Sequence, residues 1–175
     1  MSGSWVDEWK RPDQNIKEVT VMSDNQNPSQ PDPALRRLGC LVGTWAMEGN
    51  QVGSNEQNIR GETTFRWLPG GFFLEQRARL DFAGQPIDAL ELIGYDPQTD
   101  SFPSTAFSGF SPTPLPYRWD VQGDRVTITV AYAPLDASFT GLWREDGTFA
   151  GGWRPNPGAD ETVNVPYDIG GHRLE

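Results

Sequence analysis

The sequence predicts an all-β protein, a closed up-and-down antiparallel barrel of about 8–10 strands that follows a short N-terminal helix. After Gly43, apolar and polar residues alternate with a period of two over most of the chain, as in strands covered on one face. Short reversals rich in Gly and Pro separate these segments. No helical crossover lies between them, so neighbouring strands are expected to pair antiparallel, and closure would remove exposed sheet edges.

A near-repeat predicts one hairpin in detail. The segments Phe139-Thr-Gly-Leu-Trp143 and Phe149-Ala-Gly-Gly-Trp153 flank Arg-Glu-Asp-Gly. Antiparallel pairing around a turn at Asp146-Gly147 would set Trp143 beside Phe149 and Phe139 beside Trp153. Two large cross-strand aromatic pairs are therefore expected to hold this hairpin.

The domain boundary is predicted from composition: residues 1–33 form an N-terminal extension and Pro-rich linker, and residues 34–175 form the barrel domain. Both lysines, Lys10 and Lys17, lie in the first 21 residues, whereas all eleven basic residues after Met22 are Arg. Residues 23–33 are polar and interrupted by Pro, and bury too little apolar area to order themselves. The extension is either a loosely ordered tail or a segment that docks through Trp5 and Trp9, on the domain or on a neighbour in a homodimer.

The barrel domain is expected to begin with a helix. Asp32 and Pro33 suit its N-cap and first position, and Leu35, Leu38 and Leu41 follow at helical spacing. Over residues 72–82 the even positions are apolar except for Gln76, and the odd positions are mostly charged, which indicates one enclosed and one wet face. The strands are predicted over residues 44–50, 58–68, 72–82, 87–95, 102–110, 117–121, 125–133, 138–143, 148–153 and 163–174.

Composition excludes several classes of partner. A net charge of −10 and a pI near 4.5 argue against binding to nucleic acid or to an anionic membrane surface. One cysteine, Cys40, and one histidine, His172, leave too few ligands for a metal site such as zinc within one chain. No segment reaches the roughly 18 apolar residues of a membrane helix, and no signal peptide is evident, so a cytoplasmic protein is expected.

Strand alternation also predicts an aromatic interior, either filled by its own side chains or open to one small ligand. The residues expected to bind such a ligand are Phe65, Trp67, Leu74, Gln76, Tyr117, Trp119, Tyr132, Trp143 and Trp153. Three polar residues are candidates for catalysis: Gln76, Glu91 and Tyr132.

The orientation of Glu91 is ambiguous in the sequence. It alternates with Ile87, Ala89, Ile93 and Tyr95, whereas Leu90 and Leu92 belong to the opposite face. Burying the two leucines removes more apolar area from water than burying one isoleucine and a tyrosine near the strand end. Glu91 is therefore expected on the surface. If it instead lay inside, loss of hydration would raise its pKa and make it a candidate general acid or base.

Four segments together resemble a bacterial calycin-like β-barrel family of unknown function. The first, Leu41-Val-Gly-Thr-Trp45, contains an L-x-G-x-W motif. The other three are Trp67-Leu-Pro-Gly-Gly-Phe-Phe-Leu-Glu75, Ile93-Gly-Tyr-Asp96 and Tyr167 to Arg173. The family is similar to nitrobindin and to fatty-acid-binding barrels. The resemblance implies a lipocalin-like barrel around an apolar cavity, with no established reaction. Nitrobindins hold haem through a histidine near the C-terminus, a region where this chain has His172. A protein without cofactor is the expectation, and haem on His172 is the alternative.

Three functions remain open at this point. The barrel binds a small apolar ligand as a carrier, sensor or sequestering protein; or it is a cyclase, isomerase or dehydratase that acts on a hydrophobic metabolite; or it is a filled barrel that serves as an interaction module. An enzyme of this kind should place an ionisable side chain against the lumen.

Overall fold

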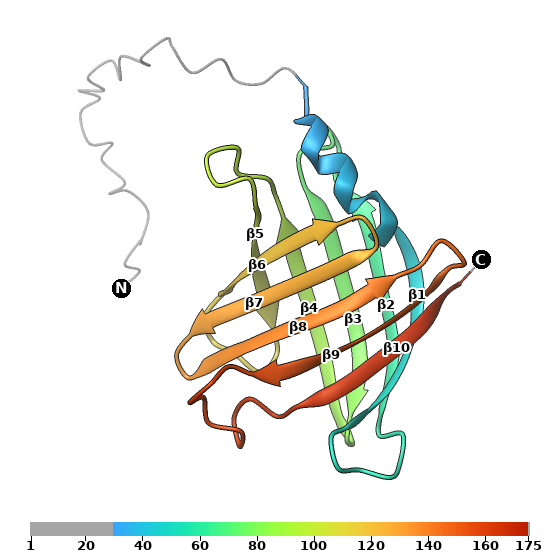
Figure 1. Ribbon diagram of the computed structural model, residues 1–175, viewed down its shortest axis with the longest axis vertical. Coiled ribbons are helices and arrows are strands. Elements are labelled where there is room, and N and C mark those ends of the chain that lie inside the picture. The colour runs from blue at the N-terminus through green and yellow to red at the C-terminus, as the bar shows by residue number, and fades with distance from the viewer. Residues whose placement is uncertain (1–29, 175) are drawn as a thin grey trace, which may run out of the picture.

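The computed structural model describes residues 30–174, which form a closed barrel of ten antiparallel strands preceded by one short helix (Figure 1). The predicted fold class is confirmed. The elements are η1 (Pro33–Leu41), β1 (Gly43–Gln51), β2 (Ile59–Trp67), β3 (Leu74–Phe82), β4 (Gln85–Ile93), β5 (Phe102–Ser108), β6 (Leu115–Gln122), β7 (Arg125–Tyr132), β8 (Leu135–Trp143), β9 (Thr148–Pro155) and β10 (Tyr167–Leu174). Residues 1–29, with Trp5 and Trp9, lie outside the described residues, so their docking in a homodimer stays a prediction.

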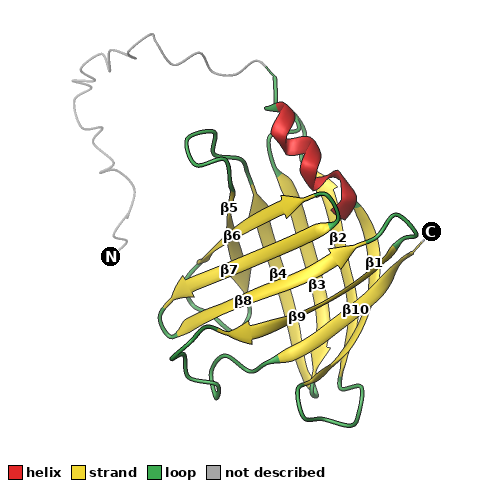
Figure 2. Cartoon of the chain, viewed as in Figure 1, coloured by secondary structure: helices red, strands yellow, loops and turns green. Residues whose placement is uncertain are grey.

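Each strand pairs with its neighbours in the sequence, and the sheet closes where β1 pairs with β10 (Figure 2). This last pairing runs from Thr44 opposite Leu174 to Gln51 opposite Tyr167. Closure requires a very close approach at Gly171, where an added Cβ would lie only 1.9 Å from the carbonyl oxygen of Ala46. Glycine at this position lets the first and last strands pair without a steric clash.

The hairpin predicted from the near-repeat is present in β8 and β9. Trp143 lies opposite Phe149 and Phe139 lies opposite Trp153, as expected. The first pair is stacked, with ring centroids 4.7 Å apart, and the second pair is separated by 5.8 Å. The Phe139 ring lies against the inner face of the sheet at Gly151. An added Cβ at Gly151 would lie 2.5 Å from this ring, so the position requires glycine.

The helix η1 packs at the end of the barrel where β1 begins (Figure 1). The Asp32 side chain caps it by accepting a hydrogen bond from the backbone N–H of Ala34 at 2.8 Å. Its three leucines are buried, and Leu38 is fully inaccessible to solvent. The indole of Trp45 on β1 donates to the carbonyl oxygen of Leu41 at 2.7 Å, which links helix and barrel. The predicted helix is therefore confirmed, and it takes the tighter 3-10 form.

We expect Leu38→Ala to lower the free energy of unfolding by about 2–5 kcal/mol, because it removes a fully buried side chain where helix and barrel meet. Urea denaturation followed by tryptophan fluorescence measures the change. Arg36→Ala, at an exposed position on the same helix, should shift stability by less than about 0.5 kcal/mol. Equal stabilities for the two variants would show that the helix is not part of the cooperative core.

Candidate functional site

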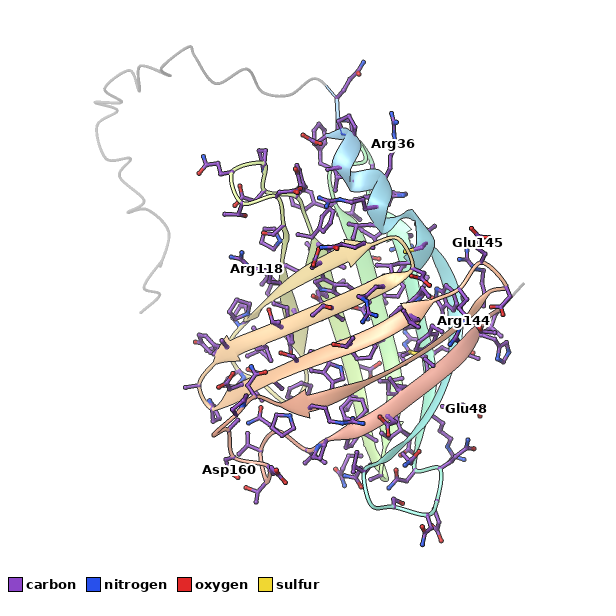
Figure 3. All side chains as sticks on the ribbon, in the orientation of Figure 1. Arg36, Glu48, Arg118, Arg144, Glu145 and Asp160 are labelled. Carbon is purple, nitrogen blue, oxygen red and sulfur yellow. The ribbon has the colours of Figure 1, made fainter. Side chains whose placement is uncertain are left out.

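The barrel interior contains a cavity of about 380 Å³. All ten strands contribute to its wall, together with Phe110 and with residues 163–165 from the loops at that end. Asp160, in the loop between β9 and β10, and Arg36, on η1, mark the two opposite ends of the molecule in Figure 3. Residues 163–165 line the cavity near the Asp160 end, and the core residues Trp143 and Phe149, which contact Trp45, line it toward η1.

One side of the cavity wall is aromatic. Phe139, Trp143, Phe149 and Trp153 from the β8–β9 hairpin all line it. Trp153 makes an edge contact with Tyr117 of β6, at a centroid distance of 6.0 Å. On this side of the wall, a small molecule would meet large apolar surfaces and few hydrogen-bonding groups.

The facing wall carries a buried carboxyl group. Glu91 on β4 is only 9% exposed and lines the cavity, so the expected surface position for it is wrong. Its oxygen Oε1 accepts hydrogen bonds from Ser104 Oγ at 2.5 Å and from Trp119 Nε1 at 2.7 Å. Within residues 30–174, no group donates a hydrogen bond to its second oxygen, Oε2. Leu90 and Leu92 instead take the outer face of β4 and are half-buried there.

Burial dominates the electrostatics of this wall. It raises the pKa of Glu91, and the hydrogen bonds from Ser104 and Trp119 offset only part of that effect. Burial and the nearby Glu91 charge raise the pKa of Tyr117 to about 12. Burial and the neighbouring Tyr117 raise the pKa of Tyr167 as well. Both phenols are consequently neutral near pH 7, and Glu91 is the one carboxyl group on the described cavity wall.

Other polar atoms on the cavity wall are less completely satisfied. Gln76 lies directly opposite Glu91 in the β3–β4 ladder, and its amide donates to Thr63 Oγ1 at 3.3 Å. Among the described residues, Ser108 Oγ and Trp143 Nε1 are buried without a hydrogen-bond partner, and both residues line the cavity. A buried polar atom without a partner costs free energy, so these atoms are sites where a ligand or water would be stabilised.

The residues predicted to bind a ligand divide into two groups. Phe65, Gln76, Tyr117, Trp119, Trp143 and Trp153 line the cavity. Trp67 and Leu74 face each other between β2 and β3 but pack into the core near η1, away from the cavity. Tyr132, the last residue of β7, is 42% exposed and does not line the cavity, so its predicted inward placement is corrected. Alternation identifies the inner face of a strand but not the level along the barrel axis.

Several polar residues of the site, including Ser108, were not singled out from the sequence. Ser104 sits on the inner face of β5, and Thr63 and Tyr167 come from β2 and β10. The sequence does contain one indication of Ser104. It alternates with Phe102 and Ala106 on the inner face, where an apolar residue would be usual.

The residues present do not fit a haem held by His172 inside the barrel. His172 is exposed, and it alternates on β10 with Ile169 and Gly171, which belong to the inner face. Its imidazole therefore lies on the outer side of the sheet. No group of three or more potential metal-ligating residues occurs within residues 30–174.

Comparison with known proteins places the chain in a family. Residues 30–144 match the family described as "Protein of unknown function (DUF1579)", so the chain belongs to this family. No curated protein matches the chain. The structure is similar to the crystal structure of Rv2717c from M. tuberculosis, with 14% sequence identity and a TM-score of 0.54 over 83% of this chain and 100% of that chain. At this identity the likeness supports the fold alone.

Within residues 30–174, no helix is long and apolar enough to span a membrane.

We expect Glu91→Gln to gain stability relative to the wild type as the pH rises from about 4 to about 8. Burial raises the pKa of Glu91 in the folded barrel, so its favourable contribution is complete at low pH and is lost as the pH rises through the folded value. Urea unfolding at several pH values measures the difference. Glu62→Gln, which makes the same change at an exposed position on the outer face of β2, is the matched control. A Glu91→Gln effect that is independent of pH would contradict the raised pKa.

Proposed function

We propose that this protein binds one small, largely apolar molecule in the barrel cavity, as a carrier, sensor or sequestering protein. The observation that carries the proposal is an interior volume of about 380 Å³ whose wall is aromatic on one side and carries a buried carboxyl group on the other. That volume lies at the lower end of the range for small-molecule pockets. The closed barrel and the family of unknown function are compatible with this role, and a calycin-like relationship forms part of the same proposal.

The unpartnered polar atoms support a ligand over a self-filled interior. Ser108 Oγ, Trp143 Nε1 and the free oxygen of Glu91 belong to residues that line the same cavity. A barrel that only needed to fill its core would be more stable with apolar side chains at these positions. We infer that the polar groups are kept because they orient a bound molecule.

Binding should be saturable and should depend on the cavity volume. We expect the uncharged dye N-phenyl-1-naphthylamine to bind with 1:1 stoichiometry and enhanced fluorescence, and Ala78→Phe to weaken this by about tenfold or more. Ala78 lines the cavity, so the new ring would occupy ligand space. Ala131→Phe, which adds the same ring at an exposed position on β7, should bind like the wild type. Native mass spectrometry of the protein as isolated would identify a natural ligand directly.

Absence of saturable dye binding to the wild type, or equal binding by Ala78→Phe and the wild type, would contradict a ligand cavity.

A second candidate function is acid or base catalysis on a hydrophobic metabolite. The specific observation in its favour is the buried Glu91, whose pKa is raised and whose Oε2 is free to exchange a proton with a ligand. In the proposed roles, Glu91 is the acid or base and Gln76 positions the substrate. Tyr132 takes no part, because it lies outside the cavity.

This alternative predicts catalysed proton exchange. The compound recovered from the protein would be incubated in D₂O with wild type or with Glu91→Gln, and deuterium uptake at carbon followed by NMR. We expect uptake with the wild type and a loss of at least about a hundredfold in the variant. If the wild type does not accelerate uptake, this assignment of Glu91 as an acid or base fails, while binding remains the proposed function.

A further inference from the structure

We propose that the ligand of this cavity is an organic cation, an amine or quaternary ammonium on a small apolar body, whose positive charge pairs with the Glu91 carboxylate. The inference rests on the proposed binding function and specifies the chemistry of its ligand. Three independent features of the described residues carry it.

The first feature is a buried acid without a counter-ion. Within residues 30–174, none of the ion pairs involves Glu91, and its two hydrogen-bond donors, Ser104 and Trp119, are both neutral. Arg154 is the one basic residue on the described cavity wall, and it is occupied by Asp168 and by the carbonyl oxygens of Trp153 and Tyr167. A buried carboxylate is stabilised by pairing with a positive charge, and none of the described residues supplies one to Glu91, so a cationic ligand would provide the counter-ion of its ionised form.

The second feature is the aromatic surroundings of the carboxyl group. Trp119 hydrogen-bonds to Glu91, and Phe65 contacts Trp119 edge to face with ring centroids 6.1 Å apart. Tyr117 lies close enough for the Glu91 charge to influence its hydroxyl group. Aromatic faces attract ammonium groups through their quadrupoles, and quaternary ammonium ligands are commonly bound among aromatic side chains.

The third feature is the charge around the cavity end. The loops at this end comprise residues 52–58, 83–84, 109–114, 133–134 and 156–166, and their charged residues are all acidic: Glu56, Asp160 and Glu161. Hydrogen bonds from Thr162 lower the pKa of Asp160, which keeps it ionised. The basic residues on neighbouring strands, Arg60, Arg79 and Arg154, are each paired with an aspartate. A negative rim attracts cations and repels anions.

Pairing with a cation should also change the protonation of Glu91. Burial favours its neutral form in the empty barrel, and an ammonium group favours the carboxylate, so binding expels a proton. The affinity for a cation therefore rises with pH. The groups facing Glu91 are Gln76 on β3, Ser104 on β5, and Tyr117 and Trp119 on β6, with Tyr167 beyond Tyr117. Of these only the two tyrosines titrate, and both stay neutral up to about pH 9.

The test uses two probes of one shape. Benzyltrimethylammonium carries a permanent charge, and neopentylbenzene is its uncharged isostere, so the charge of the probe does not vary with pH. Each probe displaces N-phenyl-1-naphthylamine from wild type, Glu91→Gln and Glu62→Gln between about pH 5 and about pH 9. The amide of Glu91→Gln can still accept from Ser104 and Trp119, so the cavity keeps its shape. Glu62→Gln makes the same charge change on the outer face.

We expect the cation to bind wild type and Glu62→Gln at about pH 8 at least about tenfold more tightly than Glu91→Gln, with an affinity that rises with pH only when Glu91 is present. The neutral isostere should bind Glu91→Gln at least as tightly as it binds wild type. Equal cation affinities for wild type and Glu91→Gln would overturn the inference, as would failure of the cation to displace bound dye. If the dye itself does not bind, the proposed function fails.

Discussion

Pairing of the first strand with the last is the constraint on which the remaining structure depends. The β1–β10 ladder turns a ten-strand sheet into a closed surface, so every alternating strand acquires an inner and an outer face. Without this ladder, the inner aromatic side chains would lie on an open sheet with two exposed edges. The ladder depends in turn on glycine, because a side chain at Gly171 would collide with the backbone of Ala46.

The closed barrel contains both a packed core and a cavity. Near η1, the three buried leucines of the helix, Trp45 and the ends of several strands form a solid core that supplies stability. Elsewhere in the interior, the wall side chains leave about 380 Å³ unfilled. Stabilisation of one end by packing allows the other end to keep a cavity and a buried carboxyl group, both of which lower stability.

Two glutamates on adjacent strands show how strongly the side of the sheet governs chemistry. Glu75 on β3 lies on the outer face, where hydrogen bonds from Arg77 and Arg66 lower its pKa. Glu91 on β4 lies on the inner face, where burial raises its pKa. The first carboxylate has its charge balanced within the chain, and the second has an oxygen without a partner on the wall of a cavity. This contrast is why the carboxyl group on the inner face of the sheet, and not the one on the outer face, is central to the proposed function.

From local periodicity and turn chemistry alone, the sequence predicts the barrel class, the N-capped helix with its three leucines and the aromatic pairs of the β8–β9 hairpin. It also identified six of the cavity-lining residues, namely Phe65, Gln76, Tyr117, Trp119, Trp143 and Trp153. It did not determine the orientation of Glu91, since two leucines on the other face made the opposite choice more favourable by apolar area. The sequence also did not show that Trp67, Leu74 and Tyr132 lie outside the cavity wall, because alternation does not give the position of a residue along the barrel axis. These points depend on contacts between residues that are distant in the sequence. The strand register and the closure of the sheet set which inward side chains meet around the cavity, and Ser104 and Trp119 satisfy a carboxyl oxygen of Glu91 there.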